Sequence, residues 1–337
     1  MKKITYAFSI LLTLFTSTQT IENLHGVVLA AGKSRRFNTD YSKLSAPICG
    51  LPMILHVISP LAQLDMPITL VVGYKKEIVA DIITKAKVPN VFLTEQQEQL
   101  GTGHALLCAI DTLQADNIMV VNGDMPLVST ETIQALYDKH IETDATISIV
   151  TSYCVDPNIE YGRIVEHDGK TEVIEAKHFT YDIHDYPYVN AGIYLISRDF
   201  LEKHLQKVQQ NSVTGEFYIT DLVKIASDNN HTVATIAVPF ETIHGVNTLK
   251  QLAHVEHMIC NNIIESFMNQ GVRFIKPDSI HLDVDVTIGK NTIIHPGVHI
   301  YNGTTIGKNC IIKPFVILDG VIVPDNTTID AYSNLVG

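Results

Sequence analysis

The sequence predicts an α/β fold in three parts: a doubly wound sheet, one long helix and a short left-handed parallel β-helix. Apolar runs alternate with amphipathic stretches from Leu24 to about Pro239, which predicts the sheet. After Pro277 an aliphatic residue recurs at every sixth position, which predicts the β-helix. With 337 residues, 46% of them hydrophobic and 18% charged, the chain has enough apolar side chains for one large core or two smaller ones.

Five continuous apolar runs are the expected strands, because a sheet covered on both faces is built from such runs. Four amphipathic stretches between them are the expected helices. The strands are Gly26–Ala30, Ile68–Val72, Val91–Thr94, Ile118–Val121 and Thr146–Val150; the helices are Pro52–Leu64, Lys76–Lys85, Gly103–Leu113 and Thr130–His140. Ligands of such sheets bind beyond the carboxyl ends of the strands, so the loops after Ala30 and Val121 are candidate sites.

The last ninety or so residues predict a helix and a solenoid. Lys250–Gln270 has an apolar stripe at helical spacing and predicts one long helix. The six-residue repeat then indicates about two coils of a β-helix, or three if Val323 and Ile329 continue it out of phase. So short a solenoid is expected to need the helix or other subunits for stability. The repeated residues are Ile288, Ile294, Ile300, Ile306, Ile312 and Leu318.

Charge and cysteine content exclude several classes of function. A net charge of −12 at pH 7 leaves no general basic surface for DNA or RNA. The five cysteines are odd in number, far apart and never arranged as C-x-x-C. Buried reduced thiols of a cytosolic protein are therefore expected, rather than a zinc site or a disulfide framework. The cysteines are Cys49, Cys108, Cys154, Cys260 and Cys310.

Residues 1–23 resemble a secretory signal peptide, with two lysines, a mostly apolar stretch from Tyr6 to Phe15 and then small polar residues. An A-x-A cleavage site is missing, and the apolar stretch is too short to span a bilayer comfortably. The segment is either an export or anchoring signal, or an extension that precedes a cytosolic domain. We favour a dispensable extension or a loose anchor on a cytoplasmic protein, and membrane association is expected only if the anchor is real.

Two strand ends carry the residues that suggest chemistry. In "VVLAAGKSRRF" (27–37) an apolar run stops at Gly32 and is followed by Lys33, Arg35 and Arg36, a common way to receive a phosphate. In "VVNGDMPLV" (120–128) Asp124 ends a strand, where a metal-binding carboxylate is natural. Alone, each signal is weak, because glycine loops are widespread and a strand-end aspartate is usually a turn or cap residue.

Further motifs follow in a fixed order: "EQQEQLGTGHA" (95–105), "EYGRIV" (160–165), "VIEAK" (173–177), "YVNAGIYL" (188–195), "GEFYITDLV" (215–223) and "HGVNTLKQL" (244–252). With these motifs the chain resembles the bacterial bifunctional N-acetylglucosamine-1-phosphate uridylyltransferase/glucosamine-1-phosphate acetyltransferase family. The resemblance implies a Rossmann-like nucleotidyltransferase domain at 24–249, a linking helix at 250–276 and a truncated left-handed β-helix at 277–337. It also implies the reaction of UTP with N-acetylglucosamine 1-phosphate to give UDP-N-acetylglucosamine and pyrophosphate, with Mg²⁺, in envelope polysaccharide synthesis such as that of peptidoglycan.

The resemblance also implies a role for single residues. Arg36 and Lys43 match the cations that hold and activate the triphosphate, and Asp124 and Asn247 match the protein ligands of magnesium. The nucleotide and uracil would contact Leu29, Ala30, Ala31, Gly32, Gln96, Gln99, Gly101, Thr102 and Gly123, in addition to Lys43 and Asn247. The N-acetylglucosamine would contact Gly162, Glu175 and Asn190.

Departures from the family pattern leave alternatives open. Ser34 replaces a glycine and Arg35 a threonine of the glycine loop, and Asn122 stands where a tyrosine often precedes G-D. There are two alternatives. The chain is a nucleotidyltransferase of other base or sugar specificity, or it is a non-catalytic nucleotide-sugar-binding homologue. The residues of the family's acetyltransferase lie in coils beyond Gly337, so we expect one activity only. The arm is expected to pack or to form a homotrimer.

Overall fold

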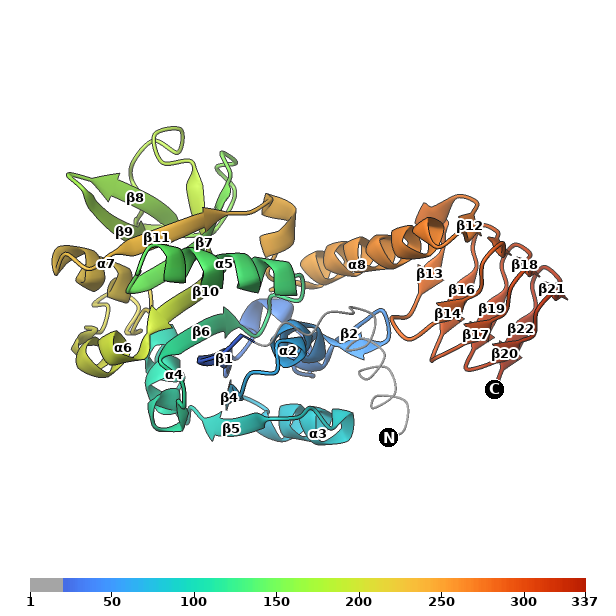
Figure 1. The fold of residues 1–337 in the computed structure, drawn as a ribbon, viewed down its shortest axis with the longest axis horizontal. Coiled ribbons are helices and arrows are strands. Elements are labelled where there is room, and N and C mark those ends of the chain that lie inside the picture. Colours follow the sequence, from blue (N-terminus) through green and yellow to red (C-terminus); the bar gives the residue numbers. More distant parts are fainter. Residues whose placement is uncertain (1–20) are drawn as a thin grey trace.

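The computed structural model describes residues 21–337, so the prediction for the signal-like segment falls almost wholly outside the described residues. Figure 1 shows a large α/β body, a long helix α8 (Leu249–Asn269) and an arm of stacked short strands. The predicted fold class is confirmed. None of the helices within residues 21–337 combines the length and apolar content that crossing a membrane requires.

The central sheet brings the ends of two candidate strands together. Its strands β1 (Leu24–Ala30) and β6 (Asn117–Asn122) are parallel neighbours, and Val28 pairs with Val121. The carboxyl ends of these strands therefore meet at one edge of the sheet. The full order is β11 (Val233–Ala237), β7 (Ile147–Tyr153), β10 (Tyr188–Ser197), β6, β1, β4 (Ile68–Val72) and β5 (Val91–Glu95), with β10 antiparallel to both neighbours and the hairpin of β8 (Arg163–His167) and β9 (Lys170–Ile174) attached to it.

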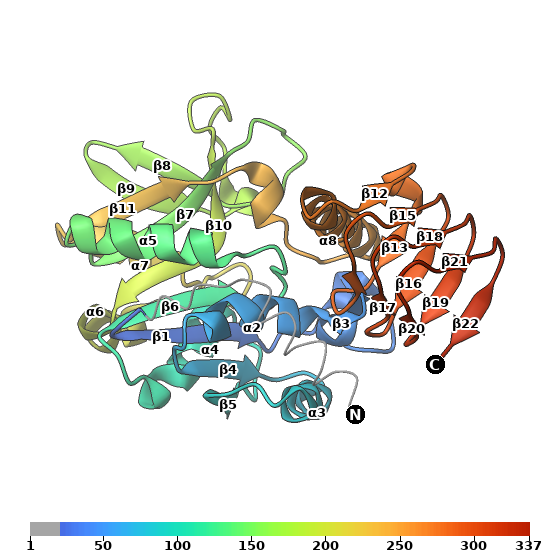
Figure 2. The same ribbon diagram turned by 45° about the vertical axis from the view of Figure 1, so that its right-hand side comes forward.

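Helices cover both faces of this sheet (Figures 1 and 2). Along β1, Val28 belongs to one apolar cluster and Val27 to another, because successive side chains of a strand point to opposite faces. This two-sided burial explains the continuous apolar runs in the sequence. The helices are α2 (Met53–Gln63), α3 (Lys76–Ala86), α4 (Thr102–Ala109), α5 (Thr130–Glu142), α6 (Arg198–His204) and α7 (Asp221–Asp228).

The arm is a parallel β-helix with three faces, and it is longer than predicted. Two faces stack four strands and the third stacks three, whereas the repeat indicates two to three coils. The arm extends beyond the six counted positions at both ends. It begins earlier, at β12 (Arg273–Phe274), and it continues in a last coil that is one residue shorter and therefore out of phase with the six-residue repeat. The strands of the three faces are β12, β15 (Ile293–Ile294), β18 (Ile311–Ile312) and β21 (Thr328–Ile329); β13 (His281–Leu282), β16 (His299–Tyr301), β19 (Ile317–Asp319) and β22 (Asn334–Val336); and β14 (Thr287–Ile288), β17 (Thr305–Ile306) and β20 (Ile322–Val323).

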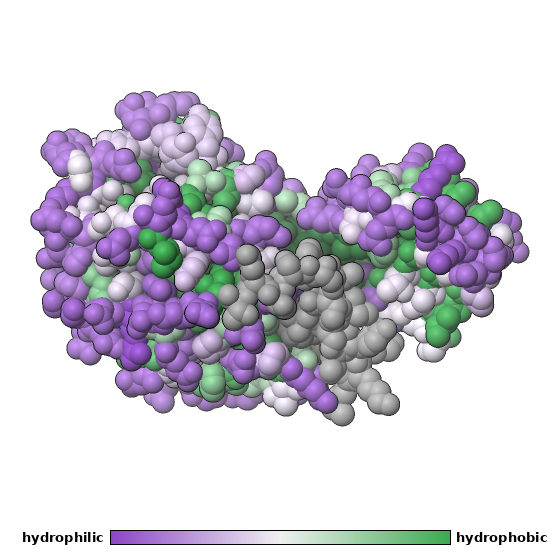
Figure 3. Space-filling model, in the orientation of Figure 1, coloured by the Kyte–Doolittle hydropathy of each residue, from purple (hydrophilic) through white to green (hydrophobic). Residues whose placement is uncertain are grey.

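The repeated aliphatic residues form the interior of the arm. All six that the sequence singles out are buried, and each pairs with the residue one coil away. On the outside of the arm, hydrophobic patches remain among hydrophilic residues (Figure 3), and Phe315, Ile322, Tyr332 and Val336 are exposed. The homotrimer expected from the sequence stays a prediction.

A small hairpin of the α/β body contacts both α8 and the first coil. It consists of β2 (Pro47–Ile48) and β3 (Leu51–Pro52), and it lies beside the helix in both ribbon views (Figures 1 and 2). The backbone N–H of Val284 in the first coil donates to the carbonyl of Cys49 at 3.0 Å. Helix α8 itself begins with a capping box in which Thr248 and Gln251 satisfy each other's backbone N–H groups. The body, the helix and the arm thus share one continuous core at this junction.

Candidate active site

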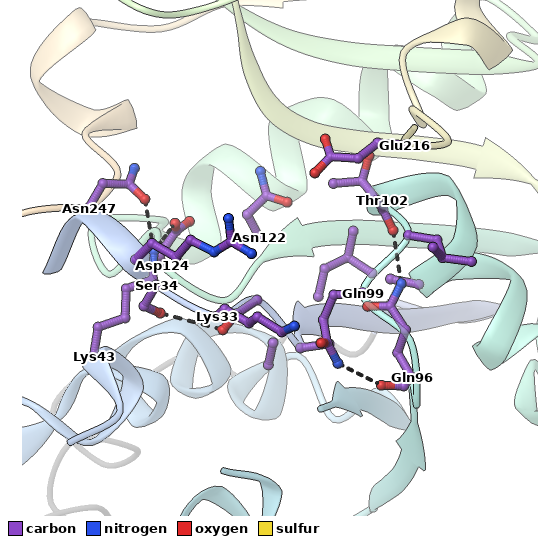
Figure 4. Close-up of a pocket in the computed structure, with 18 of the residues that line it drawn as sticks. Lys33, Ser34, Lys43, Gln96, Gln99, Thr102, Asn122, Asp124, Glu216 and Asn247 are labelled. Atoms are coloured by element: carbon purple, nitrogen blue, oxygen red, sulfur yellow. Dashed lines mark hydrogen bonds and ion pairs between the residues drawn. The ribbon is translucent and has the colours of Figure 1, made fainter. Parts of the chain in front are cut away.

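A cleft of about 750 Å³ opens at the sheet edge where β1 and β6 end (Figure 4). It is lined by twelve residues to which the sequence assigns a role, from five separate segments of the chain. Segments far apart in sequence therefore meet in one cavity. The twelve are Leu29, Ala30, Ala31, Gly32, Arg36, Lys43, Gln96, Gln99, Gly101, Thr102, Asp124 and Asn247.

The glycine loop forms one wall of the cleft. A Cβ at Gly32 would meet nothing within 4 Å, so the loop backbone there faces open space. Ser34 has φ 52° and ψ 38°, a left-handed conformation in which glycine is the usual residue. Arg36 at the rim forms an exposed ion pair with Glu160, Nη1 to Oε2 at 2.6 Å, so this side chain spans from the glycine loop to the loop before β8.

Lys43 lies at the base of the cleft and is the most enclosed of its cations. Its Nζ donates to Asp124 Oδ2 at 2.6 Å, Asn247 Oδ1 at 2.9 Å and the Val246 carbonyl at 3.0 Å. All three ammonium hydrogens are thereby used. The two predicted metal ligands and a predicted catalytic cation thus form one cluster (Figure 4), although these residues are 81 and 204 positions apart from Lys43 in sequence.

The predicted uracil loop forms the opposite wall, at the start of α4. Gln96 is buried and donates from Nε2 to the Gly101 carbonyl at 3.0 Å, and Gln99 donates to the Gln96 carbonyl at 3.1 Å. Gly101 has φ +99°, and a Cβ there would lie 2.5 Å from the carbonyl oxygen of Phe217. Only glycine fits at this position, so the loop is fixed by contacts rather than by local propensity.

The three predicted sugar contacts form a separate cluster that does not line the cleft. The backbone N–H of Asn190 donates to the Gly162 carbonyl at 2.8 Å, and a Cβ at Gly162 would lie 3.6 Å from Glu175 Oε2. Glu175 accepts a hydrogen bond from Thr220 Oγ1 at 3.0 Å. Burial raises the pKa of Glu175, although this hydrogen bond opposes the rise.

Gly123 also does not line the cleft, but it holds two of its walls together. Its N–H donates to the Leu29 carbonyl at 2.8 Å, which joins the loop after β6 to the end of β1. A Cβ at this position would lie 3.0 Å from the same carbonyl oxygen. The position therefore supports the cleft from behind.

Sequence reasoning missed several residues that line the cleft. One group comes from the segment before α7. This segment is joined to the predicted uracil loop by two backbone hydrogen bonds: Gly103 N–H donates to the Phe217 carbonyl at 2.8 Å, and Phe217 N–H donates to the Leu100 carbonyl at 2.8 Å. The motif that contains these residues is visible in the sequence, but nothing local shows that it turns toward the cleft. The missed residues are Leu44, Leu100, Ala105, Asn122, Thr214, Gly215, Glu216 and Tyr218.

Within residues 21–337, no cluster of three or more histidine, cysteine, aspartate or glutamate side chains is arranged to hold a metal ion. A metal in the cleft would therefore depend on one carboxylate and one amide from this chain, together with oxygens of the substrate. Magnesium accepts such a set, since it is often held by one or two carboxylates, water and phosphate oxygens.

Comparisons with known proteins match both parts of the chain. The MobA-like NTP transferase domain family matches residues 26–157, and the bacterial transferase hexapeptide family (six repeats) matches residues 285–320. The bifunctional protein GlmU of Thermosipho melanesiensis is 38% identical over 271 residues, which is 80% of this chain and 58% of that protein. The GlmU proteins of Thermosipho africanus (36% identical, 80% of this chain and 58% of that protein) and Carboxydothermus hydrogenoformans (34%, 82% and 62%) are similar in the same way.

The chain spans about three fifths of the length of these relatives, 58% to 62%. The matched residues include the glycine loop, the strand end at Asp124 and the repeats that build the arm. The chain is therefore a relative of the bifunctional GlmU proteins, with a MobA-like NTP transferase domain followed by bacterial transferase hexapeptide repeats.

Proposed function

We propose that this chain is a sugar-1-phosphate nucleotidyltransferase that joins UTP and N-acetylglucosamine 1-phosphate into UDP-N-acetylglucosamine and pyrophosphate. The observation that carries the proposal is the cluster of Lys43, Asp124 and Asn247 in the cleft beside the glycine loop. Similarity to the GlmU proteins supports the same reaction class.

The reaction requires two anions to meet, and the cleft supplies positive charge for this purpose. A sugar phosphate is already an anionic nucleophile, so no general base has to remove a proton. The main barrier is repulsion between this phosphate and the α-phosphate of the nucleotide, and positioned cations lower it. Lys33, Arg35, Arg36 and Lys43 all line the cleft.

Lys43 has to exchange a partner to act on a phosphate. Its three hydrogen bonds go to Asp124, Val246 and Asn247, so a phosphate oxygen replaces one of these acceptors when Lys43 binds it. The replacement has to be anionic, as a phosphate oxygen is, because a buried ammonium without an anionic partner is costly where water is scarce. Arg36 is exposed at the rim and paired with Glu160. To bind a triphosphate there, it exchanges the Glu160 carboxylate for a phosphate oxygen.

The oxygens around Lys43 fit a small divalent cation. Asp124 Oδ2 and Asn247 Oδ1 both lie within 3 Å of one positively charged atom, so two hard oxygens already converge on a cation. Mg²⁺ bound there would neutralise phosphate charge during transfer. Asp124 and Asn247 would hold it, while Lys43 is released toward the substrate.

Neighbouring residues support selection of the base and the sugar. Gln96 and Gln99 present amide groups next to Gly101, where backbone and side-chain donors and acceptors can pair with the edge of a uracil. Glu175 offers a buried carboxylate as an acceptor for a sugar hydroxyl or an amide N–H, since Thr220 bonds to only one of its oxygens. Discrimination by such buried polar groups is strong because the wrong substrate leaves them unpaired.

The test is pyrophosphate release from UTP and N-acetylglucosamine 1-phosphate with Mg²⁺. Asp124→Ala should lower kcat by roughly 100- to 1,000-fold, as removal of one electrostatic contact to the transition state does. Asp111→Ala, an exposed aspartate in the turn after α4, is the matched control and should keep full activity. Full activity of Asp124→Ala would refute the proposed role of this cluster.

The same assay separates the alternatives. All four NTPs and several sugar 1-phosphates are compared; a preference for dTTP or ATP would replace the proposed substrates but keep the reaction class. Tight UTP binding without pyrophosphate release would instead favour a non-catalytic binding protein. Incubation with glucosamine 1-phosphate and acetyl-CoA tests the prediction of a single activity, and fractionation of cells tests the predicted cytoplasmic location.

A further inference from the structure

Tyr161 is a half-buried residue whose side chain reaches the loop that carries Asn247. Its hydroxyl donates to the Ile243 carbonyl at 3.1 Å and accepts from the backbone N–H of Gly245 at 3.1 Å. Its ring packs edge-on against Phe240, with the ring centroids 5.9 Å apart. One hydroxyl therefore joins two backbone groups of the same loop.

This loop has no regular secondary structure to fix its shape. Residues 244–247 are all described and form neither helix nor strand, between the short helix η6 (Phe240–Ile243) and α8. An irregular segment keeps one conformation only where contacts with the rest of the molecule hold it. The two hydrogen bonds of the Tyr161 hydroxyl are such contacts.

The held part of the loop lies beside both predicted metal ligands. A Cβ at Gly245 would lie 3.9 Å from Asp124 Oδ1 and 3.9 Å from Asn247 Nδ2. The next residue, Val246, donates from its N–H to the Asp124 carbonyl at 2.8 Å. A displacement of Gly245 would therefore also displace Asn247 relative to Asp124.

We propose that Tyr161 is a positioning residue of the transferase, whose hydroxyl holds this loop so that Asn247 lies beside Asp124 and shares the metal ion with it. The inference rests on the proposed function, because it concerns the same metal and the same reaction. Tyr161 does not line the cleft, so it acts through Asn247 and not on the substrate.

The residues on either side of Tyr161 contact two other predicted parts of the site. Glu160 forms the ion pair with Arg36, and the Gly162 carbonyl accepts from the Asn190 N–H at 2.8 Å in the predicted sugar cluster. Three consecutive residues thus contact a predicted triphosphate cation, the loop of a predicted metal ligand and a predicted sugar contact. The hydroxyl of Tyr161 is the connection of this segment to the metal.

The hydroxyl is in the form that its hydrogen bonds require. Burial and the negative charge of Asp124 raise the pKa of Tyr161, although the hydrogen bond from Gly245 opposes the rise. A phenol with a raised pKa is neutral at pH 7, so it can donate to the Ile243 carbonyl. Phenylalanine has the same ring without the hydroxyl, so Tyr161→Phe removes the two hydrogen bonds and keeps the packing.

The first measurement is the Mg²⁺ dependence of pyrophosphate release from UTP and N-acetylglucosamine 1-phosphate by Tyr161→Phe. Loss of a group that orients a metal ligand typically lowers metal affinity or activity by 10- to 100-fold, so the half-saturating Mg²⁺ concentration should rise roughly 10-fold. Excess Mg²⁺ should restore most of the rate. An unchanged half-saturating Mg²⁺ concentration, with or without a lower rate, would overturn the proposal, because a merely structural role does not move this value.

Hydrogen exchange followed by mass spectrometry tests the same contact without the reaction. In Tyr161→Phe the amides of residues 244–247 should exchange about 5- to 10-fold faster, since the loop has lost hydrogen bonds that oppose its opening. Exchange in the strands of the central sheet should stay the same. Unchanged exchange of residues 244–247 would show that Tyr161 does not hold the loop.

Tyr137→Phe is the matched control, because it removes the same group at an exposed contact, where the Tyr137 hydroxyl donates to the Glu22 carbonyl at 3.3 Å. It should keep both the original Mg²⁺ dependence and the original exchange of residues 244–247. Failure of the proposed function has a different signature: the unsubstituted chain would then release no pyrophosphate. Exchange would in that case still decide whether Tyr161 holds the loop.

Discussion

The arm and the α/β body bury similar aliphatic residues in different ways. In the central coils of the arm, partners are separated by one step: Ile288 pairs with Ile306 and Ile300 with Leu318, 18 positions on. In the body, Val28 pairs with Leu70 on one side and Val121 on the other, and no fixed step relates these pairs. Each coil of the arm therefore repeats one local rule, whereas each strand of the body depends on the whole topology.

The candidate site lies in the body and not in the described part of the arm. In residues 273–337 the repeated positions are occupied by buried aliphatic side chains that stack coil on coil. The parallel sheet gathers the ends of several strands at one edge, and Lys43, Asp124 and Asn247 meet there from three loops. The arm should therefore contribute to stability and assembly, and the body to chemistry.

The largest effect that tests this division is expected from Ile312→Ala in the arm. Ile312 is fully buried and pairs with Ile294 and Ile329, so its truncation leaves a cavity and should destabilise the arm by about 3 kcal/mol. Hydrogen exchange followed by mass spectrometry should show faster exchange in residues 273–337. Pyrophosphate release should stay near its original rate at temperatures where the body remains folded.

Ile322→Ala is the control for this substitution, because Ile322 is also on the arm but 81% exposed. Ile322→Ala should change the free energy of unfolding by less than about 0.5 kcal/mol. If Ile312→Ala accelerates exchange equally in the body and removes activity, the arm and body unfold as one cooperative unit, and the division between them is wrong.

Acid should affect the body more than the arm. In the body, burial lowers the pKa of His25, His56 and His140 to about 4 each. A histidine of the unfolded chain binds a proton below about pH 6.5, so stability is full above that value and falls as the pH decreases toward 4. At pH 5 the loss is about 2 kcal/mol for each histidine.

In the arm the histidine contributions oppose each other. Asp283 raises the pKa of His281, which adds stability below about pH 6.5 that is lost as the pH rises. Burial lowers the pKa of His299, which has the opposite sign. The two contributions therefore have opposite signs in the arm, whereas the three strongly shifted histidines of the body all lose stability in acid.

His140→Gln isolates one contribution in the body. The His140 ring bonds to Ser148 Oγ at 2.8 Å through Nδ1, and an amide side chain can keep a polar contact there without titrating. Urea unfolding, followed by circular dichroism because the chain has no tryptophan, is compared at pH 7 and pH 5. The variant should lose about 2 kcal/mol less than the original chain; an equal loss would show that His140 is not a source of acid sensitivity.

The same contrast governs what could be predicted from the sequence. Strand β4 has the predicted bounds and α8 differs by one residue at each end, because their patterns are local. The out-of-phase continuation at Val323 and Ile329 is present: these residues pair with Ile306 and Ile312, 17 positions away. Beyond it, Leu335 pairs with Leu318, and this last strand was not predicted. A single missing residue shifts the repeat but does not prevent it from stacking.

For the cleft, the sequence indicated which motifs matter but not how they contact one another. The contact of Gly103 with Phe217 joins segments more than a hundred residues apart, and no periodicity encodes it. For the same reason the role of Glu216 as a lining residue was missed. The ion pair between Arg36 and Glu160 also depends on the tertiary fold.

The smallest predicted effect on the free energy of unfolding concerns Ser34 in the glycine loop, where a serine occupies a backbone conformation that favours glycine. Ser34 is left-handed, with φ 52°, which costs an L-residue roughly 1–2 kcal/mol, while glycine would add back up to about 1 kcal/mol of backbone entropy. Ser34→Gly should therefore stabilise the body by about 0.5 kcal/mol in urea unfolding. Ser42→Gly is the control, because Ser42 has φ −69° in the same loop region and its replacement should destabilise. Stabilisation of both variants alike would show that the loop tolerates glycine generally, and that Ser34 carries no strain of its own.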